Sequence, residues 1–472
     1  MTEVGADEPA PSGAPGSWRR RQWPARAGLL GLLALVSLAP DPGAALPRFA
    51  YFFRDLSITF YPVREFAARE LQAGRFPVWN PYIFEGSFAV PYFHLFDLLL
   101  VAKSDPVFFS FLLTLQFPIA ALSAYALLRE LGAGRGGAFV AGAVFSLGGL
   151  CRSSANLYVF LQVLAVAPLL VLTLRRAALQ GGRFVVAAGA ILALGLTTLA
   201  AEFVGQALLL GLLLALLAAP FRTAWPRLAL ACSLGLGLSG IALLPLLGLL
   251  PETVRGQGLA SEVALGQATP PVALLQVIVP DLFGPLSDPV QTFWGKAFFP
   301  RLPYFLSLYL GPLVLALAFT GLPELSRRLR IAVASLAFCG AWFALGSAGG
   351  LAPLLMPLLR IVRYPSKAWL LPYLAVTVFA GLGAAALFQG RRLRRFLAAC
   401  LGLAALASLV MGLLHFASER VRQLAELPPE FFTPIRNSIS FGTATALVLA
   451  LVGAGLGALM LSRVVRPALG TG

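Results

Sequence analysis

Runs of about 20 apolar residues recur along the whole of this 472-residue chain, and each can form a helix that crosses a hydrocarbon core about 30 Å thick. Charged residues make up only 12% of the chain, whereas soluble globular proteins carry about 25%. The sequence therefore predicts an all-α integral membrane protein. It excludes a soluble enzyme that is attached to a membrane by a single anchor.

We predict about twelve transmembrane helices in one polytopic domain over residues 27–465. A disordered cytoplasmic segment at 1–26 precedes this domain, and a cytoplasmic tail at 466–472 follows it. The first span could be a cleaved signal peptide, but we interpret it as a retained signal-anchor. The predicted spans lie near residues 28–46, 106–128, 137–151, 158–174, 184–200, 204–219, 228–250, 304–322, 331–347, 368–388, 396–415 and 441–462.

The net charge of +16 would suggest a nucleic-acid partner in a soluble protein. Here nearly all of the excess falls on one side of the predicted membrane, which is typical of cytoplasmic turns under the positive-inside rule. We therefore expect no nucleic acid, and we place both termini in the cytoplasm. The basic turns contain Arg19, Arg20 and Arg21; Arg175 and Arg176; Arg327, Arg328 and Arg330; and Arg391, Arg392, Arg394 and Arg395.

The long polar segments fall on the opposite side, at 47–105 in the first external loop, at 251–303 in the fourth, and at 416–440. Loops this long in a compact protein usually carry function. Residues 63–73 have the apolar spacing of an amphipathic interfacial helix, with its charged residues opposite, and Gly74 is placed to end it. We therefore expect a protein that works at the outer membrane surface.

The segment at 74–86, GRFPVWNPYIFEG, resembles the YfhO family of bacterial membrane proteins, as do the Asp after the first span and the amphipathic helix between them. This family is similar to the GT-C superfamily of glycosyltransferases. The segments YLGPLVLALA at 309–318 and RYPSK within 344–371 fit the same pattern, so the resemblance covers most of residues 28–390. This chain departs from the family at Ser87 and Phe88, where a Pro usually stands, and it lacks the further domains of many longer members.

The resemblance implies a GT-C-like fold in the bacterial inner membrane, with chemistry on the extracytoplasmic face. It also implies a polyprenyl-phosphate sugar as donor and an envelope glycan, lipid or polymer as acceptor. GT-C enzymes typically place a catalytic Asp in the first external loop, and Asp55 matches that position. A divalent metal would be compatible with such a site, with Asp55 as one ligand.

Two carboxylates are candidates for catalysis. Asp55 lies just beyond the first span among apolar residues, where it could take a proton from an acceptor hydroxyl. It could equally form an ion pair with Arg54 or Arg64. Glu202 lies between two apolar runs with almost no loop, and an ionisable group so close to the membrane interior is a functional candidate. Glu202 could also simply cap the short turn.

Three cations, Arg360, Arg363 and Lys367, lie on the predicted outer side of the membrane. Because the positive-inside rule disfavours cations there, their position suggests a function. They suit the phosphate of a lipid-linked donor. Their alternative is snorkelling at the interface. Arg152, at the end of the third span, could line the same cavity or only cap its helix.

Four further residues of the first external loop are binding candidates. Trp79, Asn80 and Tyr82 of the WNPY block would shape the donor or acceptor cleft, and they also suit the interfacial aromatic belt. His94 could be an acid–base group or a metal ligand. Because it stands alone beside aromatic residues, it could also be structural.

The sequence contains no phosphate-cradling Gly loop and no other nucleotide motif, and its four cysteines lack zinc or disulfide spacing. We therefore predict a membrane glycosyltransferase that takes a sugar from a polyprenyl phosphate and needs no nucleotide. The alternatives are a transporter or flippase of lipid-linked glycans, which needs polar residues deep in several spans, and a non-catalytic scaffold of envelope assembly.

Overall fold

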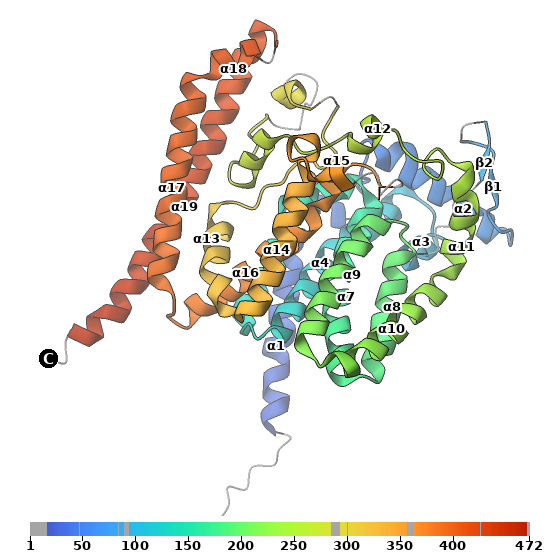
Figure 1. Ribbon diagram of the computed structural model, residues 1–472, viewed down its shortest axis with the longest axis horizontal. Coiled ribbons are helices and arrows are strands. Elements are labelled where there is room, and N and C mark those ends of the chain that lie inside the picture. Colours follow the sequence, from blue (N-terminus) through green and yellow to red (C-terminus); the bar gives the residue numbers. More distant parts are fainter. Residues whose placement is uncertain are drawn as a thin grey trace, which may run out of the picture.

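The computed structural model describes residues 17–46, 48–83, 85–88, 94–284, 293–299, 301–355, 358, 362–424 and 426–469. Figure 1 shows a helical bundle with one small two-stranded hairpin at its edge. Within these residues, seven helices are long and apolar enough to cross a membrane, or eight if a helix pair bent by 71° counts as one span. The chain is therefore a multi-pass membrane protein.

The longer helices form the bundle, and short helices lie mainly at the end that carries the external loops. The longer ones are α1 (Ser17–Leu38), α4 (Pro106–Glu130), α5 (Arg135–Leu147), α7 (Tyr158–Gln180), α8 (Arg183–Leu196), α9 (Ala201–Ala218), the bent pair α10 (Phe221–Leu238) and α11 (Gly240–Leu249), α13 (Pro312–Gly321), α14 (Arg327–Ala344), α16 (Leu370–Phe388), α17 (Leu393–Phe416) and α19 (Phe432–Leu469). The short ones are α2 (Tyr61–Gln72), α3 (Leu95–Leu99), α6 (Gly149–Ser153), α12 (Ser261–Leu265), α15 (Leu351–Leu355) and α18 (Ser418–Leu424).

Each predicted span coincides with a helix, but the count of twelve spans is not confirmed. The apolar parts of α1, α8 and α13 are shorter than a full span. The predicted span at 304–322 starts too early, because residues 301–311 are not helical and α13 begins only at Pro312, after Gly311 with φ 91°. Proline suits the first turn of a helix, where its missing N–H costs nothing.

The structure differs from the predicted N-terminal segment and adds detail to the predicted tail. Helix α1 begins at Ser17, so the N-terminal segment is not disordered as far as residue 26, and residues 1–16 lie outside the described part of the chain. At the other end, α19 continues to Leu469, into the predicted tail.

The centre of the bundle is α16, whose apolar, membrane-length stretch is 94% buried inside the protein. Glycines let its neighbours approach closely, as is common between membrane helices. A Cβ on Gly137 of α5 would stand 2.5 Å from the carbonyl oxygen of Gly381, and one on Gly321 of α13 would stand 1.9 Å from that of Phe379. Because these distances leave no room for a methyl group, α16 is fixed tightly between α5 and α13.

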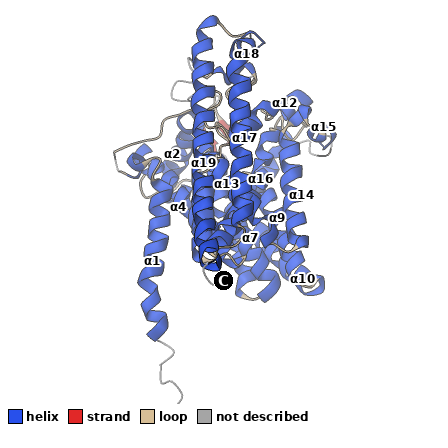
Figure 2. Cartoon of the chain, turned by 90° about the vertical axis from the view of Figure 1, so that its left-hand side faces the viewer, coloured by secondary structure: helices blue, strands red, loops and turns tan. Residues whose placement is uncertain are grey.

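The last helices form a long hairpin beside the bundle, with α18 at its tip (Figures 1 and 2). Its outer part packs on a second core made by aromatic residues of the fourth external loop. Trp294 belongs to this core and is only 2% exposed, so it is not available to stack on a sugar. The core contains Ala273, Val279, Leu282, Phe283, Phe293, Trp294, Phe299, Leu427, Phe431, Ile435 and Ile439.

Candidate functional site

A buried ion pair joins the start of α9 to the turn before α16. The Nζ of Lys367 donates to Oε1 of Glu202 at 2.8 Å, and the two side chains are 6% and 12% exposed. Arg255 approaches the same carboxylate oxygen at 3.8 Å. Glu202 lies in the first turn of α9, where the free N–H groups and the helix dipole favour a negative charge. These contacts show that Glu202 does more than cap its helix.

The backbone around Lys367 is fixed on both sides. Tyr364 adopts a left-handed conformation, and a 3₁₀ helix then runs from Pro365 to Trp369. The side chain of Gln206 donates to the backbone carbonyls of Glu202 at 2.9 Å and of Lys367 at 3.0 Å, so it ties α9 to this turn. Three rings surround the ammonium group, with centroids at 5.2 Å (Phe160), 5.6 Å (Tyr304) and 5.7 Å (Tyr364).

Arg363 brings a second cation to the same place. Its guanidinium stacks on the ring of Tyr364 at 4.6 Å, and that ring lies 5.1 Å from the ring of Tyr304. The Nε atom of Arg363 is buried and has no hydrogen-bond partner within the described chain. Such a cation is available to an anionic ligand. Arg360, predicted to act beside it, lies outside the described residues.

Asp55 reaches this group through the non-helical segment 301–311. Arg54 donates to the carbonyl of Pro303 at 3.1 Å, which holds the start of the first external loop against Tyr304. Burial raises the pKa of the Tyr304 hydroxyl; the charges of Glu202 and Asp55 raise it further, whereas Arg363 lowers it. The charges of Asp55, Glu202 and Arg363 therefore all shift the pKa of the Tyr304 hydroxyl. We call Asp55, Glu202, Tyr304, Arg363 and Lys367 the Tyr304 cluster.

The carboxylate of Asp55 makes no hydrogen bond and no ion pair with any described residue. The two arginines that could have neutralised it are engaged elsewhere, since Arg54 binds Pro303 and Arg64 binds Asp97. A partly buried carboxylate without a cation is suited to accept a proton from a bound hydroxyl.

Three residues beside the Tyr304 cluster have strained backbones. Arg54, Leu199 and Tyr364 have φ angles of 46°, 63° and 67°, in the left-handed region that non-glycine residues avoid. Arg54 directly precedes Asp55, Leu199 lies three residues before Glu202, and Tyr364 directly precedes the 3₁₀ helix that carries Lys367. Strain of this kind costs about 1–3 kcal/mol per residue and concentrates at functional sites.

Two hollows adjoin the cluster. A cavity of about 20 Å³ lies behind Tyr304, with Ser366 and Gln276 in its wall, and it is large enough for one water molecule. A more open pocket of about 260 Å³ lies beside Tyr364 and includes Glu262, Gln267 and Arg301. The second pocket is formed by residues of the fourth external loop and by Tyr364, whose ring contacts both Tyr304 and Arg363.

The WNPY block lies apart from the cluster. Trp79 and Asn80 form β1 (Trp79–Asn80), which pairs with β2 (Ser87–Phe88) in a hairpin at the edge of the molecule (Figure 1). Asn80 is buried and accepts a hydrogen bond from the backbone N–H of Tyr82, as in an Asx turn. Tyr82 is 84% exposed and its ring packs against Phe66 of α2, so the structure does not bring it to the cluster, and the role of the block in the cleft stays a prediction.

Arg152 also lies apart, against the end of α1. Its guanidinium stacks on Phe117 at 4.0 Å, donates to the carbonyl of Ser37 and approaches Asp41 at 3.7 Å. These contacts hold α1 to α4 and α6. None of these contacts involves the Tyr304 cluster, so the structure does not bring Arg152 together with Arg363 and Lys367.

His94 belongs to a second buried polar group, formed with Arg64, Asp97 and Gln162. Gln162 lies 2.8 Å from Nδ1 of His94 and donates to Asp97 at 3.3 Å, and Arg64 donates to Asp97 at 2.9 Å. Arg64 is 1% exposed, so the expectation that it lies on the charged outer face of α2 is wrong. The group ties α2 and α3 to α7, which makes His94 a structural residue.

We expect this second group to weaken below neutral pH. Burial lowers the pKa of His94 to about 4. The negative charge of Asp97 acts in the opposite direction and raises this pKa, whereas the positive charge of Arg64 lowers it further. Unfolded His94 takes up its proton near pH 6.5, so between pH 6.5 and 4 the unfolded state holds more protons and stability falls as the pH falls. Thermal unfolding in detergent should show a shallower pH dependence for His94→Gln than for the wild type.

The matched control is His415→Gln, which removes the other histidine of the chain and should keep the wild-type slope. An unchanged slope in His94→Gln would contradict a neutral buried imidazole.

Two members of the site were not predicted from the sequence, Tyr304 and Arg255. Tyr304 is the first residue of the span predicted at 304–322, although Pro303 and the Gly311–Pro312 pair signal that the helix starts later. For Arg255 the sequence contains no signal, since its contact with Glu202 depends on how the fourth external loop folds back.

Among the residues that the structure describes, no three His, Cys, Asp or Glu side chains converge closely enough to hold a metal ion by themselves.

No protein-family model matches the chain, and no curated protein matches it. Among solved structures it is similar to the archaeal oligosaccharyltransferase AglB from Archaeoglobus fulgidus in complex with an inhibitory peptide and a dolichol-phosphate. The identity is 13% and the TM-score 0.39, over 91% of this chain and 56% of that one.

Two further structures of the Archaeoglobus fulgidus oligosaccharyltransferase are similar to a comparable degree. One, tethered with an acceptor peptide containing the NVT sequon, has 12% identity and a TM-score of 0.35. The other, the apo form, has 11% identity and a TM-score of 0.36, and both matches cover 93% of this chain and 56% of the other. The chain thus spans about half the length of these proteins. Scores this low carry no conclusion, so the YfhO resemblance stays a prediction.

Proposed function

We propose that this chain is a membrane glycosyltransferase that moves a sugar from a polyprenyl-phosphate donor to an envelope acceptor on the extracytoplasmic face. The observation that carries the proposal is the composition of the Tyr304 cluster. It combines a carboxylate without a partner, Asp55, with a cation whose buried Nε has no partner, Arg363, and with the Lys367–Glu202 ion pair.

In the proposed reaction, the acceptor hydroxyl gives its proton to the carboxylate of Asp55 while its oxygen attacks the anomeric carbon of the donor. A glycosidic C–O bond forms, and the bond between the anomeric carbon and the phosphate oxygen breaks. The leaving phosphate takes the electron pair, and Arg363 and Lys367 stabilise its added charge. Glu202 positions Lys367 for this task through their 2.8 Å hydrogen bond.

The position of the charges disfavours a flippase. Such a protein needs a polar path across the bilayer, whereas α16 passes from the Tyr304 cluster to the far end of the bundle without a charged side chain. The pocket beside Tyr364 is instead formed by residues of the fourth external loop, where an acceptor and a donor head group would meet.

The proposal is tested by measuring transfer in proteoliposomes that contain a panel of polyprenyl-phosphate sugars and an envelope-glycan acceptor, with released polyprenyl phosphate as the readout. We expect Asp55→Asn to lose at least about a hundredfold in turnover, the usual contribution of a general base. Its thermal unfolding should remain close to that of the wild type, because Asp55 has no partner to lose.

The control variant is Glu430→Gln, an exposed carboxylate in the loop before α19, which should retain full activity. Equal turnover of Asp55→Asn and wild type would remove Asp55 from the mechanism. A wild-type protein that releases no polyprenyl phosphate from any donor would overturn the enzyme proposal itself.

A further inference from the structure

An apolar groove opens on the surface of the bundle between α13, α16 and α17, with a volume of about 520 Å³. Phe319 in its wall is 59% exposed. On α17 the groove is lined by Ala399, Gly402 and Leu403, whose spacing places them on one helix face. The other lining residues are Leu315, Ala318, Leu322, Val376 and Phe379.

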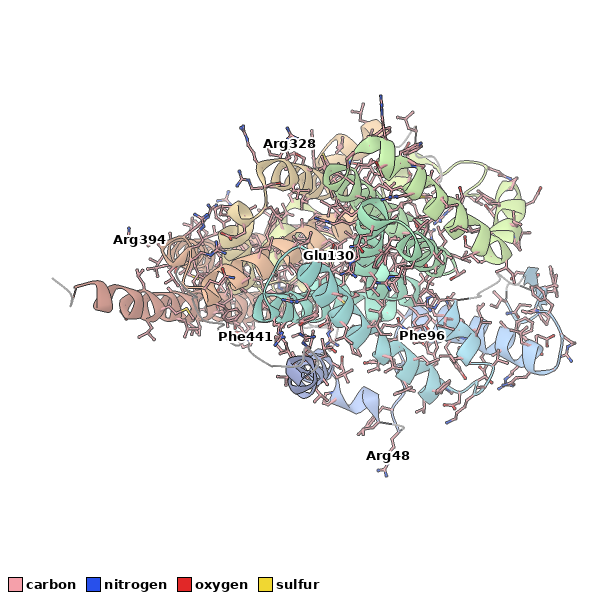
Figure 3. All side chains as sticks on the ribbon, turned by 90° about the horizontal axis from the view of Figure 1, so that it is seen from below. Arg48, Phe96, Glu130, Arg328, Arg394 and Phe441 are labelled. Atoms are coloured by element: carbon pink, nitrogen blue, oxygen red, sulfur yellow. The ribbon has the colours of Figure 1, made fainter. Side chains whose placement is uncertain are left out.

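One end of this groove carries unneutralised positive charge. The guanidinium of Arg395 lies 5.6 Å above the ring of Phe319, and both Arg394 and Arg395 are exposed. Neither forms an ion pair with a described residue, whereas the neighbouring Arg391 and Arg392 share the carboxylate of Glu324 at 2.7 and 3.1 Å. Figure 3 shows Arg394 at the outer edge of the bundle, on the side of α17 and α19.

The charges stand at the start of α17, which begins at Leu393 and has no side-chain cap. The free N–H groups of this first turn add to the attraction for an anion. Gly402 lies seven residues beyond Arg395, about 10 Å along the helix axis. The apolar groove therefore runs from the basic end to a depth that lies within one leaflet of a membrane whose core is about 30 Å thick.

We propose that this site binds an anionic glycerophospholipid. Arg394 and Arg395 hold its phosphate, and one acyl chain fills the groove. A cation pair at the rim of an apolar groove is the arrangement that recognises anionic lipids between membrane helices. A soluble anion could bind the two arginines but would leave the groove empty. Because the lining of the groove is almost wholly apolar, a ligand with an acyl chain fits the site better.

This lipid site is separate from the Tyr304 cluster. Lys367 precedes α16 and Arg391 follows it, so the 19 residues of the helix put the two sites about 28 Å apart along its axis. The proposal consequently does not depend on the proposed glycosyl transfer, and the two can fail independently.

Native mass spectrometry of the purified full-length protein tests the proposal, with palmitoyl-oleoyl phosphatidylglycerol and phosphatidylcholine as probes in parallel titrations. We expect one tightly bound phosphatidylglycerol and clearly weaker phosphatidylcholine. Arg394→Gln/Arg395→Gln should weaken phosphatidylglycerol binding about 30-fold, which is about 2 kcal/mol. Inorganic phosphate at millimolar concentration should not displace the lipid.

Gly402→Leu tests the groove itself. A Cβ at Gly402 meets no atom within 4 Å, so the larger side chain fills the groove without a clash inside the bundle. We expect at least tenfold weaker lipid binding with unchanged thermal unfolding. Gly455→Leu is the matched control, because Gly455 is equally open but lies on α19 outside the groove.

The charge control is Arg183→Gln/Arg222→Gln, which removes two exposed arginines at the starts of α8 and α10, on the other side of the bundle (Figure 1). Equal affinity for phosphatidylcholine and phosphatidylglycerol would overturn the proposal. So would a loss of binding in the Arg183/Arg222 variant as large as that in the Arg394/Arg395 variant, or full binding in Gly402→Leu.

Discussion

Replacing Glu202 by Gln is expected to lower the free energy of unfolding by about 3 kcal/mol, since breaking a buried ion pair leaves an uncompensated charge. The ammonium of Lys367 would remain buried beside Arg255 and Arg363 without its carboxylate. We expect transfer activity to fall as well, because Lys367 would lose its position at the leaving phosphate. Thermal unfolding in detergent and donor KM measure the two effects.

The double variant Glu202→Gln/Lys367→Met separates charge from packing. It removes both charges, so it should recover part of the stability that the single change loses. Activity should not return, since the phosphate has lost a cation. Glu419→Gln is the matched surface control, because the Glu419 side chain is 46% exposed and its pair with Arg422 lies at the surface, where ion pairs contribute little to stability. A double variant less stable than Glu202→Gln would contradict this account.

Arg64→Met is expected to destabilise the protein by about 3–5 kcal/mol. Arg64 and Asp97 are 1% and 2% exposed at their side chains, and Arg64 also stacks on the ring of Tyr158 at 4.8 Å. Methionine restores the apolar volume, so the loss reports mainly the unpaired carboxylate of Asp97. Hydrogen exchange should rise over residues 61–72 and 94–100, which this group ties to α7.

Arg69→Met provides the control on the same helix. Arg69 is 68% exposed and pairs with Glu65 one turn away, an arrangement worth about 0.3–0.5 kcal/mol. The combined change Arg64→Met/Asp97→Asn should be milder than Arg64→Met alone. If Arg64→Met and Arg69→Met lowered the free energy of unfolding equally, the buried ion pair would contribute no more to stability than the exposed one.

The sequence contains enough to place the helices and part of the site. Apolar runs of membrane length locate each helix because a bilayer permits few alternatives. The sequence makes Glu202 a candidate because ionisable groups close to the membrane interior are costly, and it makes Arg363 and Lys367 candidates because outward-facing cations run against the positive-inside preference. The ion pair of Glu202 with Lys367 joins residues 165 positions apart, and no local pattern predicts it.

The remaining features depend on tertiary contacts that no local pattern records. Arg64 has the spacing of a surface residue on α2, yet Asp97 compensates its charge and allows it to be buried. Tyr304 lies in an apolar run that resembles a span, but hydrogen bonds from Arg54 to Pro303 and between Ser153 and Ser307 hold this run in a non-helical form. The WNPY block is specific in sequence, but the structure uses it in a hairpin at the edge.

The packing of the C-terminal hairpin bears on the order in which the protein can be assembled. Ile435 and Ile439 of α19 complete the aromatic core that contains Phe283 and Trp294, and the segment with Tyr304 follows directly from that core. A ribosome makes α19 after the fourth external loop and after the segment with Tyr304. The outer loop can therefore acquire its final shape only once α19 has been synthesised and inserted, so the Tyr304 cluster stays unfinished until that point of translation.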